Sequence, residues 1–239
     1  MQVEDILNTV IQGDSLEIMK QLPDKCIDLI VTSPPYNKGK RKVGNNQTWY
    51  AYDIDYDSYS DDLPEEEYNL WQKEIMTECF RLLKEGGSIF YNHKPIYRDG
   101  LVRLPLNLVN DFPLRQVIIW DRGSSPDLNV NKFYPTTEWI LWFSKGKPKF
   151  NGGEFANYKE VWRMNYENNN THPAPFPVEL PMRCILSTTS EKDIVLDTFM
   201  GSGTTALACK QTNRNFIGID ISQKYCDIAN ERLKQDLLF

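Results

Sequence analysis

The sequence predicts an α/β protein whose doubly wound, mostly parallel sheet has seven strands, with helices on both faces. Short runs of β-branched and other apolar residues, typical of strands buried on both faces, alternate with segments of helical spacing. Two of these runs end in proline-rich or glycine-rich loops, and such folds bind ligands at the carboxyl ends of their strands. A chain of 239 residues needs no second domain to bury a core. We therefore expect residues 1–239 to form a single domain.

The order of the elements follows from these patterns. The seven predicted strands are residues 10–14, 27–33, 88–92, 117–121, 138–143, 194–197 and 216–220. Helical spacing between the first two strands gives a β-α-β unit. A longer helix is predicted from Pro64, where a proline and three glutamates open the helical pattern, to the stop at Gly86 and Gly87. Two further helices should begin at Thr204 and at about Gln223.

Two segments lack a sustained period of either strand or helix. Residues 37–62 are polar and rich in Asp, Tyr, Lys and Gly, which predicts a long loop of the kind that is functional or mobile. Residues 144–171 are polar and rich in Asn, and we expect them to form a small substructure of their own.

Composition limits the class of protein. The net charge of −6 has the wrong sign for a protein that coats nucleic acid non-specifically, so any DNA contact needs a local basic patch. The five cysteines are scattered and form no C-x-x-C pair, which argues against a disulfide framework or a thiolate zinc site, and we expect no metal. No run of about 18 apolar residues occurs, and the N-terminus lacks an export signal. We expect a cytoplasmic protein that does not bind membranes.

The first ligand-binding candidate is the loop of residues 197–205, which reads Asp-Thr-Phe-Met-Gly-Ser-Gly-Thr-Thr. Glycines at a strand-to-helix junction let backbone N–H groups approach a ligand, although a plain turn has the same pattern. The Gly-Lys-Ser/Thr signature of a phosphate loop is absent. Asp220 closes the next strand about 20 residues on, where a carboxylate can accept hydrogen bonds from ribose hydroxyls. The pattern favours a nucleoside ligand.

The second candidate is Ser33-Pro34-Pro35-Tyr36, directly after a predicted strand. The Ser33 hydroxyl and the Pro34 carbonyl can accept hydrogen bonds, the prolines fix their backbone, and the Tyr36 ring offers a stacking face for a flat ligand. A double-proline turn with a buried tyrosine is the alternative. At the end of the 88–92 strand, His93 is expected to orient its neighbours or lie on the surface.

Together the two loops resemble those of S-adenosylmethionine-dependent DNA amino-methyltransferases of the cytosine-N4 and adenine-N6 type. The catalytic loop precedes the cofactor loop, as in the circularly permuted β arrangement of that family. The resemblance implies a permuted, Rossmann-like methyltransferase fold, base flipping, and a site-specific enzyme of a restriction-modification system. It also implies that residues 144–171 contribute to target recognition.

The resemblance assigns roles to individual residues. The catalytic residues it implies are Ser33, Pro34, Pro35 and Tyr36. The S-adenosyl-L-methionine site it implies consists of Asp14, His172, Asp197, Phe199, Gly201, Ser202, Gly203, Thr204, Thr205 and Asp220. Asp14 also fits an ordinary helix N-cap, and the segment around His172 also fits a proline turn that leads a helix. Phe176 stands where many relatives carry a lysine.

Substrate and partners are constrained less tightly. A serine before Pro-Pro-Tyr favours cytosine N4 over adenine N6 within the family. The densest basic run comprises Lys38, Lys40, Arg41 and Lys42, and it either binds DNA phosphates or is simply a solvated charge run. Double-stranded DNA is the implied partner, with a cognate restriction endonuclease and a second copy of the chain as further candidates. The rival functions are methylation of RNA or of a protein amide, and a nucleic-acid-binding regulator without catalysis.

Overall fold

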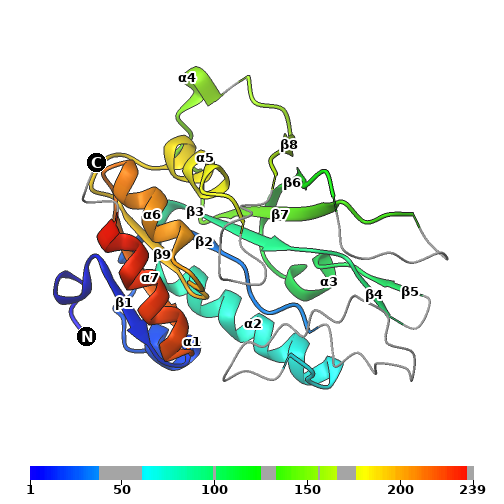
Figure 1. The fold of residues 1–239 in the computed structure, drawn as a ribbon, viewed down its shortest axis with the longest axis horizontal. Coiled ribbons are helices and arrows are strands. Elements are labelled where there is room, and N and C mark those ends of the chain that lie inside the picture. The colour runs from blue at the N-terminus through cyan, green and yellow to red at the C-terminus, as the bar shows by residue number, and fades with distance from the viewer. Residues whose placement is uncertain (38–60, 99–100, 125–132, 156, 166–175, 236–239) are drawn as a thin grey trace.

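The computed structural model describes residues 1–37, 61–98, 101–124, 133–155, 157–165 and 176–235. Figure 1 shows a sheet with helices on both sides. Among the described helices, none combines the length and the apolar character needed to cross a membrane.

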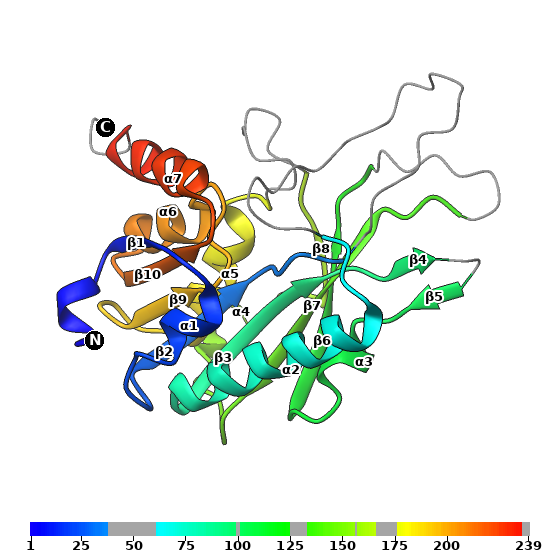
Figure 2. The ribbon, with the colours of Figure 1, turned by 90° about the horizontal axis from the view of Figure 1, so that it is seen from below.

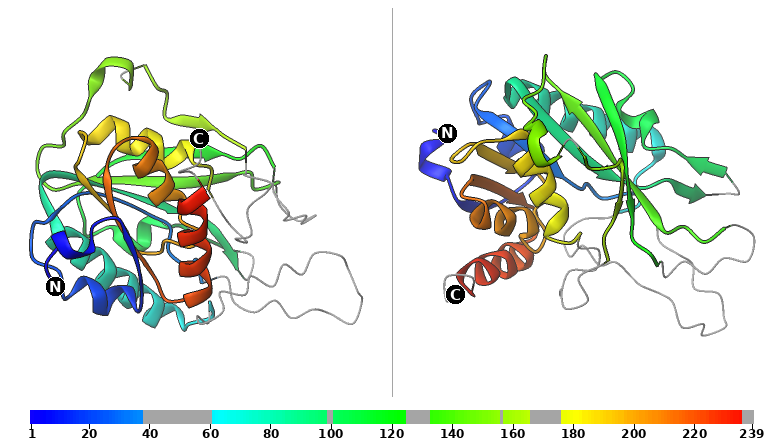
Figure 3. Two further views of the ribbon diagram at one scale, coloured as in Figure 1. Left: turned by 60° about the vertical axis from the view of Figure 1, so that its left-hand side comes forward. Right: turned by 90° about the horizontal axis from the view of Figure 1, so that it is seen from above.

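A single eight-stranded sheet runs through this part of the chain. Its strands, in spatial order, are β1 (Thr9–Gln12), β10 (Asn215–Asp220), β9 (Ile194–Asp197), β2 (Ile27–Thr32), β3 (Leu83–His93), β7 (Thr137–Ser144), β6 (Leu114–Asp121) and β8 (Val161–Arg163). The first five run parallel to one another, β7 runs antiparallel to both of its neighbours, and β8 is parallel to β6. Figure 3 shows the curvature of this sheet. A separate hairpin pairs β4 (Ile96–Arg98) with β5 (Leu101–Arg103) and projects beyond the sheet in Figure 2.

The helices form two layers, and each layer packs against its own apolar cluster. The described helical elements are η1 (Glu4–Ile6), α1 (Ser15–Met19), α2 (Glu65–Leu82), α3 (Leu106–Val109), α4 (Gly152–Phe155), α5 (Glu179–Thr188), α6 (Thr204–Gln211) and α7 (Gln223–Gln235). One cluster joins the sheet to α1, α2 and α3, and the other joins it to α5, α6 and α7. The predicted α/β class, with a mostly parallel sheet covered on both faces, is confirmed.

The predicted sheet is one strand short in the described part of the chain, and the β4–β5 hairpin was not predicted. All seven predicted runs are strands, and the eighth, β8, lies inside the 144–171 segment. Its three residues alternate exposed, buried and exposed, which is too short a pattern to detect in the sequence. At the edge of the sheet, β8 is held by the parallel pairing of Val161 with Ile119 and of Arg163 with Asp121.

The predicted helix stop at Gly86 and Gly87 was also wrong. The helix α2 ends at Leu82, and both glycines belong to β3, where the register with β2 shifts. Gly86 has a φ of +81°, and a Cβ on Gly87 would lie 2.9 Å from the Asp28 carbonyl oxygen. The glycines therefore allow a close approach within an irregular strand and do not end the helix.

A buried carboxylate ties the central strands together. Asp197, which is 1% exposed at the end of β9, accepts a hydrogen bond at 2.9 Å from the Thr32 hydroxyl at the end of β2. It accepts two more, from the Thr205 hydroxyl at 2.6 Å and from the Phe199 N–H at 3.1 Å. These bonds fix β2, β9 and α6 relative to one another at the edge where both candidate loops begin.

Burial raises the pKa of Asp197 from 3.8 to about 6, against the opposing effect of its three hydrogen bonds. Because the folded-state pKa is raised, the contribution of this group to stability is fully present below about pH 4 and is lost as the pH rises through 6. An Asp197→Asn variant lacks this titration. Between pH 4 and pH 7 the free energy of unfolding of the wild type should therefore fall by about 2 kcal/mol relative to the variant, as urea denaturation at each pH measures.

The exposed Asp5 supplies the control, because Asp5→Asn removes a carboxylate that lies at the surface. That variant should follow the wild type across the pH range. Parallel stability profiles for the wild type and Asp197→Asn would show that Asp197 does not titrate in this way.

Candidate active site

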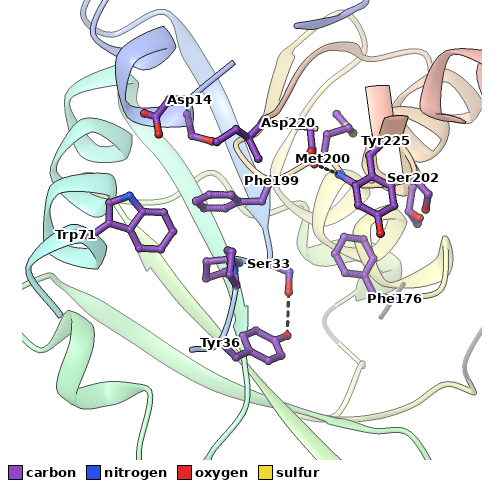
Figure 4. A pocket seen from close by; sticks show the side chains of 16 residues that line it. Asp14, Ser33, Tyr36, Trp71, Phe176, Phe199, Met200, Ser202, Asp220 and Tyr225 are labelled. Atoms are coloured by element: carbon purple, nitrogen blue, oxygen red, sulfur yellow. Dashed lines mark hydrogen bonds between the residues drawn. The ribbon is translucent and has the colours of Figure 1, made fainter. Parts of the chain in front are cut away.

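One pocket brings the two candidate loops together at the carboxyl ends of the strands. Figure 4 shows Ser33 and Tyr36 on one side, Asp14 and Asp220 on another, and Phe199 between them. The residues of the predicted site that line the pocket are Asp14, Ser33, Pro34, Pro35, Tyr36, Phe199, Gly201, Ser202, Thr204 and Asp220. The loop after β2 thus faces the loop after β9 across a single cavity.

The loop after β9 is folded back onto β10 by Asp220. This carboxylate accepts hydrogen bonds from the Gly201 N–H at 2.8 Å and from the Ser222 N–H at 2.9 Å. Burial nevertheless raises the pKa of Asp220 above its ordinary value. Gly203 precedes α6 with a φ of +82°, and a Cβ there would lie 2.9 Å from the Ala229 Cβ. Glycine at this position therefore allows both the turn and the contact with α7.

Asp14 occupies the end of the neighbouring strand. Its side chain accepts a hydrogen bond at 3.0 Å from the Glu17 N–H and so caps α1, which is the ordinary role expected for it. It also lines the pocket. The Gly13 N–H donates to the Asp220 carbonyl at 2.9 Å, which holds the ends of β1 and β10 together. The N-cap and a ligand contact are therefore compatible at this residue.

The loop after β2 is held by buried polar side chains. Pro35 accepts a hydrogen bond at 2.7 Å from the Tyr68 hydroxyl, which also lies 3.0 Å from His93 Nε2. The Tyr36 ring packs against His93 with centroids 4.6 Å apart and an interplanar angle of 39°. His93 is 2% exposed, so it supports the loop from inside and does not lie on the surface.

Asn37, directly after Tyr36, is hydrogen-bonded to residues at the far end of the predicted 37–62 loop. The Asn37 N–H donates to Asp61 Oδ1 at 2.6 Å, and the Asn37 side-chain amide exchanges two hydrogen bonds with the backbone of Leu63, at 2.7 and 2.9 Å. Asn37 adopts a φ of +54°, a conformation in which asparagine is enriched. The two ends of the predicted 37–62 loop are therefore bonded to each other.

Some predicted residues lie elsewhere. Asp197, Gly203 and Thr205 are not among the residues that line the pocket, and the Asp197 and Thr205 side chains bond to each other beneath the loop. They support the loop and do not form its surface. The remaining predicted residues, His172, Lys38, Lys40, Arg41 and Lys42, lie outside the described residues.

Sequence reasoning missed several residues of the site. Trp71 and Tyr225 line the pocket, as does Phe176 of the 172–177 segment, whose lining role the sequence left open. The Trp71 and Phe199 rings meet edge to face with centroids 5.6 Å apart. Trp71 is part of the helical pattern of α2 and carries no signal that separates it from core residues. The lining by Phe176 supports a role for the end of the 172–177 segment at this pocket.

Three buried polar residues behind Tyr36 were also missed. Asn92, Arg122 and Glu138 lie at the ends of β3, β6 and β7, and all are at most 7% exposed. Their hydrogen bonds reach both Tyr36 and Ser33. A signal was available, because polar side chains at the ends of otherwise apolar strands are costly to bury unless they are paired.

The pocket offers what a nucleoside ligand with an amino-acid tail requires. Aromatic and apolar side chains form its walls, the carboxylates of Asp14 and Asp220 can accept hydrogen bonds from amino and hydroxyl groups, and backbone stands close at Gly201. Among the described residues, no group of three or more His, Cys, Asp and Glu side chains could hold a metal ion.

Known proteins share this fold and sequence. The sequence profile of the N6/N4 DNA methylase family matches residues 27–231. The Type II methyltransferase M.BglII of Bacillus subtilis is 34% identical over 95% of this chain and 69% of its own length. M.HinfI of Haemophilus influenzae, also a Type II methyltransferase, is 33% identical over 98% of this chain and 70% of its own length.

Solved structures agree in fold. The cytosine-N4-specific PvuII DNA methyltransferase superposes with a TM-score of 0.75 at 23% identity, covering 93% of this chain and 85% of its own. A putative DNA modification methylase of Thermus thermophilus, solved in complex with S-adenosyl-L-methionine, gives a TM-score of 0.70 at 25% identity and covers 96% of this chain and 94% of its own. The family profile spans most of the chain and includes both loops, and the resemblance seen in those loops is confirmed: the protein belongs to the N6/N4 family of DNA methylases.

Proposed function

We propose that the protein transfers the methyl group of S-adenosyl-L-methionine to an exocyclic amino group of a base flipped out of double-stranded DNA, with cytosine N4 favoured. The main support is that Ser33 and Gly201, from loops far apart in the sequence, line one pocket. A methyl donor held at one loop and an amine held at the other would then lie side by side. Membership of the DNA methylase family supports the same reaction.

The residues around Gly201 suit the cofactor. The Asp220 carboxylate accepts backbone hydrogen bonds and has further lone pairs for ribose hydroxyls. Asp14, at the end of the adjacent strand, suits an adenine amino group, and Phe199 with Trp71 provides a flat apolar wall. When bound, S-adenosyl-L-methionine supplies an electrophilic methyl group.

The residues around Ser33 suit the amine. The Ser33 hydroxyl and the Pro34 carbonyl would accept its two N–H bonds, which draws the nitrogen lone pair out of the ring and toward the methyl group. The Tyr36 ring lines the same pocket and would stack on the base. Serine as the first residue of the motif favours cytosine, and adenine N6 is the alternative substrate.

Recognition of DNA involves parts of the chain beyond the pocket. The described portion of residues 144–171 is largely anchored: the Asn151 side chain donates to two carbonyls at the end of α5, and Arg183 stacks between Tyr158 and Trp162. Recognition by this segment would therefore use its outer surface and its last residues. The basic run at 38–42 directly follows the catalytic loop and would bind DNA phosphates. A second subunit would enlarge the interface with DNA. The protein would act in the cytoplasm.

Methyl transfer to DNA tests the function directly. Labelled S-adenosyl-L-methionine, unmethylated plasmid and the purified protein should give labelled DNA, and methylation-aware sequencing should place the label on cytosine N4 at one recurring sequence. Label in RNA or in a protein but not in DNA would support those rivals. If calorimetry detects no binding of S-adenosyl-L-methionine, a regulator that has lost catalysis would be favoured.

An Asp220→Ala variant should bind S-adenosyl-L-methionine roughly 10- to 100-fold more weakly, because hydrogen bonds to a charged acceptor are lost. Isothermal titration calorimetry measures the change. One control is Asp220→Asn, which retains the shape of the side chain. The other is Asp227→Asn, at an exposed site, which should bind like the wild type. Unchanged affinity in Asp220→Ala would remove Asp220 from the cofactor site.

A Ser33→Ala variant should bind S-adenosyl-L-methionine normally but turn over DNA roughly 100- to 1,000-fold more slowly, because one acceptor for the amine is missing. Single-turnover methyl transfer and calorimetry on the same preparation separate the two effects. Turnover equal to the wild type would show that Ser33 is not an essential acceptor.

A further inference from the structure

A buried polar network stands directly behind the catalytic loop. Glu138 Oε2 accepts hydrogen bonds from the Tyr36 hydroxyl at 3.0 Å and from Asn92 Nδ2 at 2.8 Å. Its other oxygen, Oε1, lies 3.1 Å from Arg122 Nη1. Tyr36 in turn lies 2.9 Å from the Ser33 hydroxyl, which faces the pocket. A chain of contacts therefore runs from a buried ion pair to the edge of the site.

Counting protons gives this chain a direction. The Arg122 guanidinium can only donate, so the Glu138 carboxylate paired with it accepts, and the single proton of the Tyr36 hydroxyl points to Glu138. In the 2.9 Å hydrogen bond between Tyr36 and Ser33, the Ser33 hydroxyl must then be the donor and the Tyr36 oxygen the acceptor. With its proton committed to Tyr36, the Ser33 oxygen presents lone pairs to the pocket.

The partners of Glu138 support this arrangement. The side chains of Arg122 and Glu138 are 4% and 9% exposed, and each buried charge is compensated by the other. Arg122 also donates to the Pro135 carbonyl at 2.8 Å and to the Thr136 carbonyl at 3.3 Å, which holds the guanidinium in place. The pair keeps a carboxylate in the interior, where its effect on neighbouring hydroxyls is strong.

Asn92 is oriented by the same carboxylate. Its Nδ2 lies 2.8 Å from Glu138 Oε2 and 2.9 Å from the Tyr36 oxygen. Exchanging the amide nitrogen and oxygen would place two acceptors 2.8 Å apart, so the amide donates toward Glu138. Asn92 therefore donates to the Glu138 carboxylate, and Ser33 donates to the Tyr36 oxygen, whose own proton is directed at Glu138.

We propose that Glu138 is a positioning residue that acts through the Tyr36 hydroxyl to turn the Ser33 proton away from the pocket, so that Ser33 accepts a hydrogen bond from the target amine. The value of an acceptor at Ser33 rests on the proposed function. The direction of the hydrogen bonds rests only on the geometry of the network. Reversing that direction would aim the Ser33 proton at an N–H group, which repels it.

The test replaces only the Glu138 carboxylate, in a variant in which the Asn92 amide cannot take over its role as acceptor. In Glu138→Gln alone, the Asn92 amide can turn and offer its oxygen to Tyr36. In the Asn92→Leu background, the glutamine oxygen faces Arg122 and its NH₂ group donates to the Tyr36 oxygen, so the Tyr36 proton must go to Ser33. We expect Glu138→Gln to lower kcat for DNA roughly 10- to 100-fold in that background, with an unchanged Kd for S-adenosyl-L-methionine.

A second background separates positioning from structural support. When Tyr36→Phe is added to Asn92→Leu, the path from position 138 to Ser33 is absent, and Glu138→Gln should change kcat by less than about twofold. Glu231→Gln, at a side chain that is 65% exposed on α7, is the matched control and should behave like the wild type. Equal losses with and without the Tyr36 hydroxyl would overturn the proposal, as would an unchanged kcat in the Asn92→Leu background.

A neutron structure of the wild type decides the direction of the hydrogen bonds independently of activity. The proposal requires deuterium on the Tyr36 hydroxyl directed at Glu138 and deuterium on the Ser33 hydroxyl directed at Tyr36. Deuterium on Ser33 directed into the pocket would overturn it. If the wild type methylates no DNA but the deuterium positions are as expected, the proposed function fails while the hydrogen-bond network stands.

Discussion

The burial of one carboxylate at the centre of the sheet constrains the rest of the site. Asp197 is nearly inaccessible to solvent, and a charge in such a place requires donors on every side. Those donors come from the end of β2, from the start of α6 and from the loop backbone, so pairing the carboxylate also joins these elements. The loop after β2 and the loop after β9 therefore keep a fixed relation, and a pocket forms between two segments distant in the sequence.

The fold was predictable where the sequence repeats a simple pattern. Seven of the eight strands of the described sheet were found, because they carry longer runs of β-branched or aromatic residues. Errors occurred where tertiary context decides. The pair Gly86 and Gly87 signals a helix stop, yet the close approach of the Asp28 carbonyl explains these glycines within a strand. Similarly, β8 is held by its pairing with β6, which no local pattern in three residues reveals.

The site was predictable from its two motifs, because both place their chemistry within a few consecutive residues. The contacts among the residues that support these motifs were not predictable. Asn92 and Glu138 are 46 residues apart and meet only because β3 and β7 are neighbours in the sheet. Asp197 and Thr205 were expected around the ligand, and in the structure their side chains bond to each other beneath the loop that lines the pocket. A sequence motif does not distinguish residues that face a pocket from residues that hold it. The residues at 38–42 and His172 lie outside the described part of the chain, so their predicted roles stay predictions.

Asn37 separates the loop after β2 from the segment that follows it in the sequence. This residue follows Tyr36 and is bonded to Asp61 and Leu63, so the two ends of the intervening segment meet at one closed junction. The entropic cost of closing a loop grows only slowly with its length. Insertions, deletions or whole replacements between the two ends would therefore transmit little strain to the Tyr36 ring. The junction therefore allows the sequence between its two ends to vary while the Tyr36 ring keeps its place.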